Sequence, residues 1–180
     1  MLEAAIRDCT DRLWETSMWV VAARHADAEL TGPDGTLVTD PAARHALVQR
    51  HSTPWSIAWH ALEVLDYDLA GEFVRWAPPP LFTGKAHWGE LTTLPSAWSR
   101  SEMLAYVDYC RRRVRDTLSD MTDEKAATPL PPAHRDHGRP FAWELAGLPL
   151  HTVEHASRIR PFITAARGAG GRRLVPRPGT

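Results

Sequence analysis

The chain has 180 residues, 43% hydrophobic and 24% charged, with a formal net charge of −1. This length suits one domain with its own core, and the near-neutral charge argues against general attraction to nucleic acid or to an anionic membrane. The apolar runs are shorter than the ~20 residues of a membrane span, and the first residues lack the cationic and apolar regions of a signal peptide, so we expect a cytoplasmic protein.

Two helices are expected in the first fifty residues. Residues 2–30 carry apolar side chains at three- and four-residue steps, which predicts one long amphipathic helix. The Gly-Pro-Asp-Gly sequence at 32–35 has turn chemistry and ends it. Asp40, as an N-cap followed by Pro41, indicates a short helical or irregular piece over roughly 40–50.

The second main helix is predicted over 52–72. Ser52, Thr53 and Pro54 form a start signal with proline just inside the helix. Two adjoining apolar stripes follow, and His60 lies on the inner edge of one of them. Residues 76–98 then form a long connection with three consecutive prolines and no sustained period. Such a long connection is unusual in a compact domain and is often functional.

The third main helix is predicted to begin at a capping box, Ser99-x-x-Glu102. A Pro-rich loop over 126–140 leads to the last helix, 141–167, where we expect a start or kink near Pro149 and a bend near Pro161. Almost nothing has the pattern of a strand. The sequence therefore predicts an all-α fold, a four-helix bundle over 1–167 with a long crossover connection between helices two and three, and a flexible tail over 168–180.

The motif His-Thr-Val-Glu-His at 151–155 carries most of the functional information. On a helix, His151 and His155 lie about 40° apart on successive turns, so that both rings can contact one cation. Neutral imidazole suits zinc, nickel, iron or copper. The spacing also matches the inverted zinc-protease signature, in which Glu154 would be the general base. That class needs an acidic ligand downstream, and no Asp or Glu follows His155. The paired Glu-x-x-His motifs of di-iron bundles are also missing.

A third ligand must then come from another helix, and His60 is the best candidate. Three histidines without a fourth protein ligand would leave metal positions open to water or substrate, as in a catalytic site. The alternative is that His151 and His155 are ordinary core histidines bonded to side chains or water.

This arrangement resembles the DinB-like superfamily of bacterial four-helix bundles. The resemblance depends on His60 within PWSIAWHALEVLDYDL and on His151 and His155 within HTVEHASRI, and it covers roughly residues 1–165 in helix order. Where family members often have Ala-Gly-Gln-Ile after the last histidine, this chain has Ala-Ser-Arg-Ile, a departure that leaves the three histidines in place.

The resemblance implies a divalent transition metal (zinc, nickel or iron) held by His60, His151 and His155. It also implies a small-molecule substrate, a homodimer, and an enzyme of the thiol S-transferase, isomerase or hydrolase type with a low-mass thiol as co-substrate. The second hypothesis is a non-catalytic structural or small-molecule-binding bundle with a structural metal or none. We expect no nucleic-acid or membrane partner.

The other polar and aromatic candidates receive ordinary structural interpretations. His134 and His137 are a competing metal pair in a loop, where solvation is expected. Asp66 and Asp68 are expected on a solvated helix flank, with bonding to histidine nitrogens as the alternative. Glu154 is expected near solvent or behind the metal ligands. The helix tryptophans are expected in the core: Trp14, Trp19, Trp55, Trp59 and Trp143. Cys9 and Cys110 are expected to be inert buried thiols.

Overall fold

The computed structural model describes residues 1–18, 37–50, 52–70, 97–132 and 134–168. Within these residues there are seven helices and no strand longer than an isolated bridge, so the predicted all-α class is confirmed. The helices are α1 (Leu2–Asp8), α2 (Asp11–Trp14), α4 (Pro41–Arg50), α5 (Pro54–Leu69), α6 (Arg100–Ser119), α7 (Asp123–Ala127) and α8 (Phe141–Gly168). None of them is long and apolar enough to cross a membrane.

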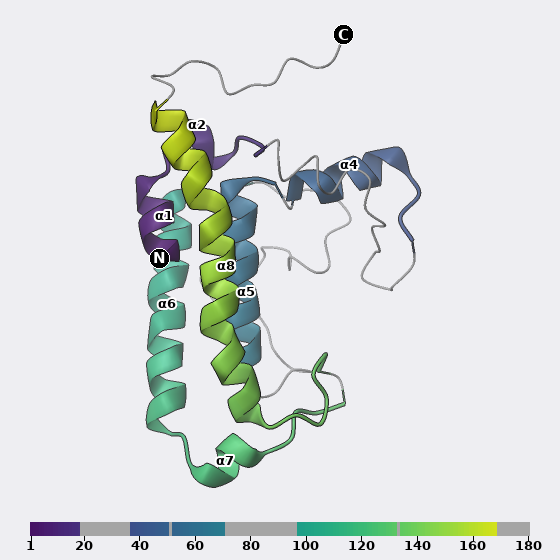
Figure 1. The fold of residues 1–180 in the computed structure, drawn as a ribbon, viewed down its shortest axis with the longest axis vertical. Helices are drawn as coiled ribbons and strands as arrows, with labels where there is room; N and C mark the ends of the chain where they lie inside the picture. Colours follow the sequence, from purple (N-terminus) through teal and green to yellow (C-terminus); the bar gives the residue numbers. More distant parts are fainter. Residues whose placement is uncertain (19–36, 51, 71–96, 133, 169–180) are drawn as a thin grey trace.

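The three long helices α5, α6 and α8 lie side by side, with α1 packed against all three (Figure 1). Helices α5 and α6 run in the same direction and α8 runs in the opposite one (Figure 1). Helix α7 closes one end of the bundle, and α4 extends sideways from the other. The C-terminal half of α5 therefore lies beside the N-terminal half of α8, which brings together polar residues that are far apart in the sequence.

Helix α5 is the central element of the bundle. Most of its side chains are buried, because α8, α6, α1 and α2 cover it from several sides. A helix that is buried nearly all round normally carries apolar residues throughout. Here three of the buried positions are acidic, namely Glu63, Asp66 and Asp68. Buried charges need partners to offset their desolvation, so these residues mark the places where α5 contacts polar groups of its neighbours.

The predicted single helix over 2–30 is wrong where it can be compared. Cys9 adopts an extended conformation (φ −73°, ψ 135°) and ends α1. Thr10 then caps α2, because its hydroxyl accepts a hydrogen bond from the Leu13 amide. A Thr N-cap competes with helix continuation by offering the backbone a different hydrogen bond. The apolar stripe nevertheless reaches the core, since Leu2, Ile6, Cys9 and Leu13 are all buried. Residues 19–30 lie outside the described part.

The other predicted helix starts are confirmed. Ser99 and Glu102 form the expected capping box at α6, and the Asp40 carboxylate accepts a 2.7 Å hydrogen bond from the Ala43 amide at α4. Helix α8 continues through Pro149 and Pro161 as one element. Both prolines are exposed, so the carbonyl that each leaves without its N–H partner has access to water.

Tryptophan side chains join the ends of α2, α5 and α6. Trp59 stacks on Trp55 and on Trp98, with ring centroids 5.6 and 5.8 Å apart. The Trp14 indole donates a 2.6 Å hydrogen bond to the Trp98 carbonyl. Core packing was expected for Trp14, Trp55 and Trp59 and is confirmed. Trp19, the 76–96 part of the expected connection, and residues 169–180 of the expected tail lie outside the described residues.

Candidate metal centre and the adjoining polar network

Helices α5 and α8 bring the imidazoles of His60, His151 and His155 together. One ring nitrogen of each lies within 4.8 Å of the others. The ring centroids are 4.4 Å apart for His151 and His155, 4.8 Å for His60 and His155, and 5.3 Å for His60 and His151. The three rings meet nearly edge-on, at interplanar angles of 73–83°. His155 is buried, whereas His60 and His151 are half-buried and form the accessible side of the group.

The geometry of this group suits a small cation. A zinc ion bound to imidazole nitrogens at ~2.0–2.1 Å in a tetrahedral arrangement separates those nitrogens by about 3.3 Å. The Nε2 atoms of His151 and His155 are 2.9 Å apart, so they need to separate only slightly. In the metal-free pair, only one of the two Nε2 atoms can donate a proton to the other. A cation would accept both lone pairs at once, so the donor set fits the metal that the resemblance implies.

The environment of His151 favours its neutral, ligand-competent form. Burial lowers the pKa of His151, and the nearby positive charge of Arg135 lowers it further, against a smaller opposing effect of Asp68. The Nδ1 atom of His151 is buried and has no hydrogen-bond partner among the described residues. A neutral imidazole keeps a lone pair available for a metal, whereas a protonated one does not.

Glu154, the base of the rejected protease interpretation, does not join the three histidines. Its side chain is 58% exposed and forms an ion pair with Arg158 one turn along α8. Because Arg158 holds the Glu154 carboxylate in solvent, this carboxylate does not reach a group bound between α5 and α8. The solvent-side expectation for Glu154 is thus confirmed.

Comparison with known proteins does not identify the chain. No protein-family model, curated protein or solved structure matches it.

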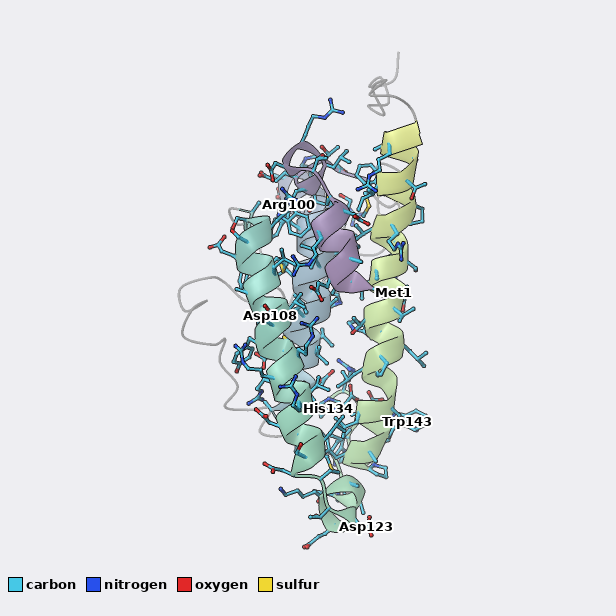
Figure 2. The ribbon with its side chains drawn as sticks, turned by 90° about the vertical axis from the view of Figure 1, so that its left-hand side faces the viewer. Met1, Arg100, Asp108, Asp123, His134 and Trp143 are labelled. Atoms are coloured by element: carbon cyan, nitrogen blue, oxygen red, sulfur yellow. The ribbon has the colours of Figure 1, made fainter. Side chains whose placement is uncertain are left out.

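A second polar cluster lies about two helical turns from the histidines. Asp68 of α5, His134 of the 128–140 loop and Glu144 of α8 are all buried, and each offers a ligand-type atom within 4.8 Å of the others. His134 Nε2 is 3.2 Å from Asp68 Oδ1 and 3.9 Å from Glu144 Oε2. Arg135 Nη2 donates to Asp68 Oδ2 at 2.8 Å and to Glu144 Oε1 at 2.5 Å. We call these four residues the Arg135 network. Figure 2 shows His134 inside the bundle, level with the N-terminal part of α8.

The hydrogen bonds of His134 argue against a metal in this second cluster. Its Nδ1 accepts a 3.0 Å hydrogen bond from the Asp136 amide, which places the proton of the neutral ring on Nε2. Nε2 is then a donor toward Asp68 and has no lone pair for a cation. Metal-bound histidines show the opposite pattern, donating their second ring N–H to an acceptor. Arg135 also occupies one oxygen of each carboxylate, so the cluster is satisfied without an ion.

Glu144 has the most perturbed acidity in the network. Burial, hydrogen bonding to Asp68 and the Asp68 charge raise the pKa of Glu144 to about 7, and the Arg135 charge only partly opposes them. Two carboxyl groups in one buried site cannot both ionise cheaply, and one of them retains a proton to higher pH. Glu144 therefore changes its charge in the physiological range.

Three expectations about these residues were wrong. His134 was expected to be solvated in its loop but is 4% exposed, because the loop folds back onto α5 and α8; His137 is exposed as expected. Asp66 and Asp68 were expected on a solvated flank but are buried, because α5 is covered on several sides. Trp143 was expected in the core but is 54% exposed and projects from α8 (Figure 2), with the Arg139 guanidinium 4.2 Å from its ring centroid.

The Arg135 network was not predicted from the sequence, and no motif indicated a role for Arg135 or Glu144. The available signal was the clustering of acidic residues on an otherwise apolar helix, Glu63, Asp66 and Asp68. Such residues require partners if the helix is buried, but the partner could not be identified before the loop position was known.

Proposed function

We propose that this chain is a DinB-like, three-histidine metal protein, a four-helix bundle with a crossover connection, and that it acts as a metal-dependent enzyme on a small-molecule substrate. The observation that carries the proposal is the meeting of His60, His151 and His155 within 4.8 Å. In this reading zinc, nickel or iron is the cofactor, and a low-mass thiol is the co-substrate.

The residues of the chain would hold the metal and leave space for the substrate beside it. His60 projects from a central helix, and His151 and His155 project from successive turns of α8, so the packing of α5 on α8 sets how far apart the three side chains begin. His60 and His151 remain half-buried, which leaves one side of the group open to a guest molecule. A bound divalent cation lowers the pKa of a thiol or water that it ligates and so supplies a nucleophile near neutral pH.

The two cysteines of the chain are unreactive, which supports the proposal that the reactive thiol belongs to a co-substrate. Burial raises the pKa of Cys9 to about 11 and raises that of Cys110 as well. Both side chains are buried, and a protonated buried thiol is a poor nucleophile. Neither cysteine lies in the three-histidine group, so a thiolate at that group must come with a ligand.

Metal analysis tests the proposal. The purified protein is loaded separately with zinc, nickel and iron(II), dialysed, and its metal is measured by plasma emission for the wild type, His155→Ala and the surface control His137→Ala. We expect about one equivalent in the wild type and control, and a loss of at least about tenfold in affinity for His155→Ala. A wild type that retains no metal after any loading contradicts the proposal.

The competing non-catalytic function is separated by a second measurement. The metal-loaded protein is heated with and without a low-mass thiol, and the absorption of a cobalt(II)-substituted sample is recorded with the same thiol. A thiol ligand to cobalt gives an intense sulfur-to-metal charge-transfer band. Strong stabilisation by metal without any spectral response to thiols favours a structural metal.

A further inference from the structure

A cavity of about 320 Å³ extends along α8 from the three-histidine group to the Arg135 network. Its lining includes Arg135, Asp136, Trp143, Glu144, Gly147 and His151. Glu144 and His151 lie at opposite ends, seven residues or about 10 Å apart along the helix axis. A pocket of this size holds a small organic molecule. The cavity thus connects two clusters that no sequence motif associates.

Gly147 lines the cavity and leaves open space beside α8. A Cβ built on Gly147 meets no atom within 4 Å. Glycine is a poor residue for a helix interior, because it loses more backbone conformational entropy on folding than alanine does and has no side chain to pack. In α8, this unfavourable glycine lies at a position where any larger side chain would project into the cavity. Gly147 therefore provides a specific way to fill the cavity without disturbing packed neighbours.

At the network end of the cavity, the Arg135 guanidinium has a donor that it does not use within the network. Arg135 uses Nη2 for both Asp68 and Glu144, and its Nε lies 3.3 Å from Asp136 Oδ2. Its Nη1 has no acceptor among the described residues, and its side chain is 54% exposed. The guanidinium is held on its inner side by two buried carboxylates, so its outward edge is already oriented for a ligand.

The carboxylates around Arg135 are less available to a ligand than this guanidinium edge. Asp68 and Glu144 are buried, and both accept from Arg135. Asp136 lies near two guanidinium groups, those of Arg135 and Arg139. A cationic ligand would have to displace one of these arginines, whereas an anionic ligand can add to Nη1. Guanidinium edges bind planar carboxylates well, through two parallel hydrogen bonds or one charge-assisted bond.

We propose that this cavity binds a small organic carboxylate, with the carboxylate on Nη1 of Arg135 and the apolar body over Gly147, pointing toward His151. The apolar part of the ligand has matching walls, because Trp143, Leu148 and Leu150 also line the cavity. The inference goes beyond the metal function, because it needs no ion at the histidines. If the metal function is also right, the same molecule would present its far end to the metal ligands.

The test uses benzoate as the probe and benzamide as its uncharged analogue of nearly the same shape. Both are titrated by calorimetry into the full-length protein with a chelator present, so that no metal can bind the probe. We expect benzoate to bind at least about tenfold more tightly than benzamide, because the charge-assisted hydrogen bond is lost in the amide. Equal affinities, or no benzoate binding at ~10 mM, overturn the proposal.

Two variants locate the probe. Gly147→Leu fills the cavity with a good helix former, and we expect a higher melting temperature together with about tenfold weaker benzoate binding. Ala142→Leu is the matched control, because Ala142 is exposed on the same helix outside the cavity. Unchanged benzoate binding in Gly147→Leu, or equal weakening in both variants, contradicts the assigned position.

Arg135→Lys tests the donor itself. Lysine keeps the charge but cannot contact Asp68, Glu144 and a ligand carboxylate in one planar arrangement. We expect the preference for benzoate over benzamide to fall toward unity, and full preference in this variant contradicts the role of Nη1. Metal content is measured on the same samples. Benzoate binding without metal binding refutes only the metal function, and the reverse result refutes only the carboxylate site.

Discussion

His134 and Asp68 are 66 positions apart in the sequence, yet His134 Nε2 lies 3.2 Å from Asp68 Oδ1 in the interior of the protein. This contact fixes the 128–140 loop on the central helix. The loop continues directly into α8, which carries Glu144 and two of the three metal-ligand candidates. The position of α8 against α5 therefore depends on a polar contact as well as on apolar packing.

Asp68→Asn should destabilise the protein more than an ordinary surface charge change. The substitution removes the buried negative charge that faces Arg135 and His134, and losing one partner of a buried pair costs several kcal/mol. Because Arg135 is half exposed and can regain water, we expect about 2–3 kcal/mol. Urea unfolding of wild type and variant measures the difference.

Asp108→Asn is the matched control for Asp68→Asn. Asp108 is 55% exposed and pairs with Arg111 on the surface of α6, so its loss should cost less than about 1 kcal/mol. If the two variants unfold at the same urea concentration, the network does not stabilise the fold as described.

Glu144 should make stability decrease as the pH rises through neutrality. The pKa of Glu144 is raised from 4.5 to about 7 in the folded chain, so the folded state binds the proton more tightly than the unfolded state between these values. Its stabilising contribution is complete below about pH 4.5 and is lost by about pH 7. We expect a loss on the order of 2 kcal/mol, measured by urea unfolding at pH 5 and pH 8.

Glu144→Gln separates this effect from the histidines, which titrate over the same range. The amide keeps the shape of the protonated acid and cannot ionise. The pH 5 to pH 8 difference attributable to Glu144 should disappear in the variant. The lowered pKa of His151 acts in the opposite direction and should remain in both proteins. A variant with the wild-type pH profile would show that Glu144 ionises as an ordinary carboxyl group.

The sequence predicted the later helix starts and the candidate three-histidine set for physical reasons that are local. Apolar periodicity, the Asp40 and Ser99 caps and the Pro54 start each act within a few residues, so they remained valid in the folded chain. His151 and His155 share a face because of helix geometry alone. His60 was placed on the inner edge by its own helix, and the packing of α5 on α8 brought it to the other two.

Errors arose where a distant segment decides the environment. Asp68 looked solvated because its helix was assumed to have an exposed side, but α5 is covered from several directions. His134 looked like a loop residue in water, and nothing near it in the sequence indicates that its loop returns to α5. Trp143 looked like a core residue because large aromatic side chains usually are, whereas here it stands beside a cavity on an exposed surface.

Both cysteines should resist alkylation in the folded protein. Cys9 and Cys110 are buried, and burial raises the pKa of both thiols, so neither offers an exposed thiolate at pH 8. We expect iodoacetamide to modify the native chain at least about a hundredfold more slowly than the urea-unfolded chain. Mass spectrometry of timed samples measures both rates. Rapid modification of either cysteine at pH 8 in the native state would assign an internal nucleophile and weaken the case for an external thiol.

Metal should stabilise the folded chain through His60 as well as through the α8 pair. A ligand that binds only the folded state adds about 2.7 kcal/mol of stability at a hundredfold excess over its dissociation constant. We expect zinc to raise the melting temperature of the wild type and of His45→Ala, whose histidine is exposed on α4. In His60→Ala most of this increase should be lost, although His151 and His155 remain on one face of α8. Because His60 is the only one of the three from α5, an undiminished zinc response would mean that the α8 pair binds the ion alone and that the two helices are not joined through it.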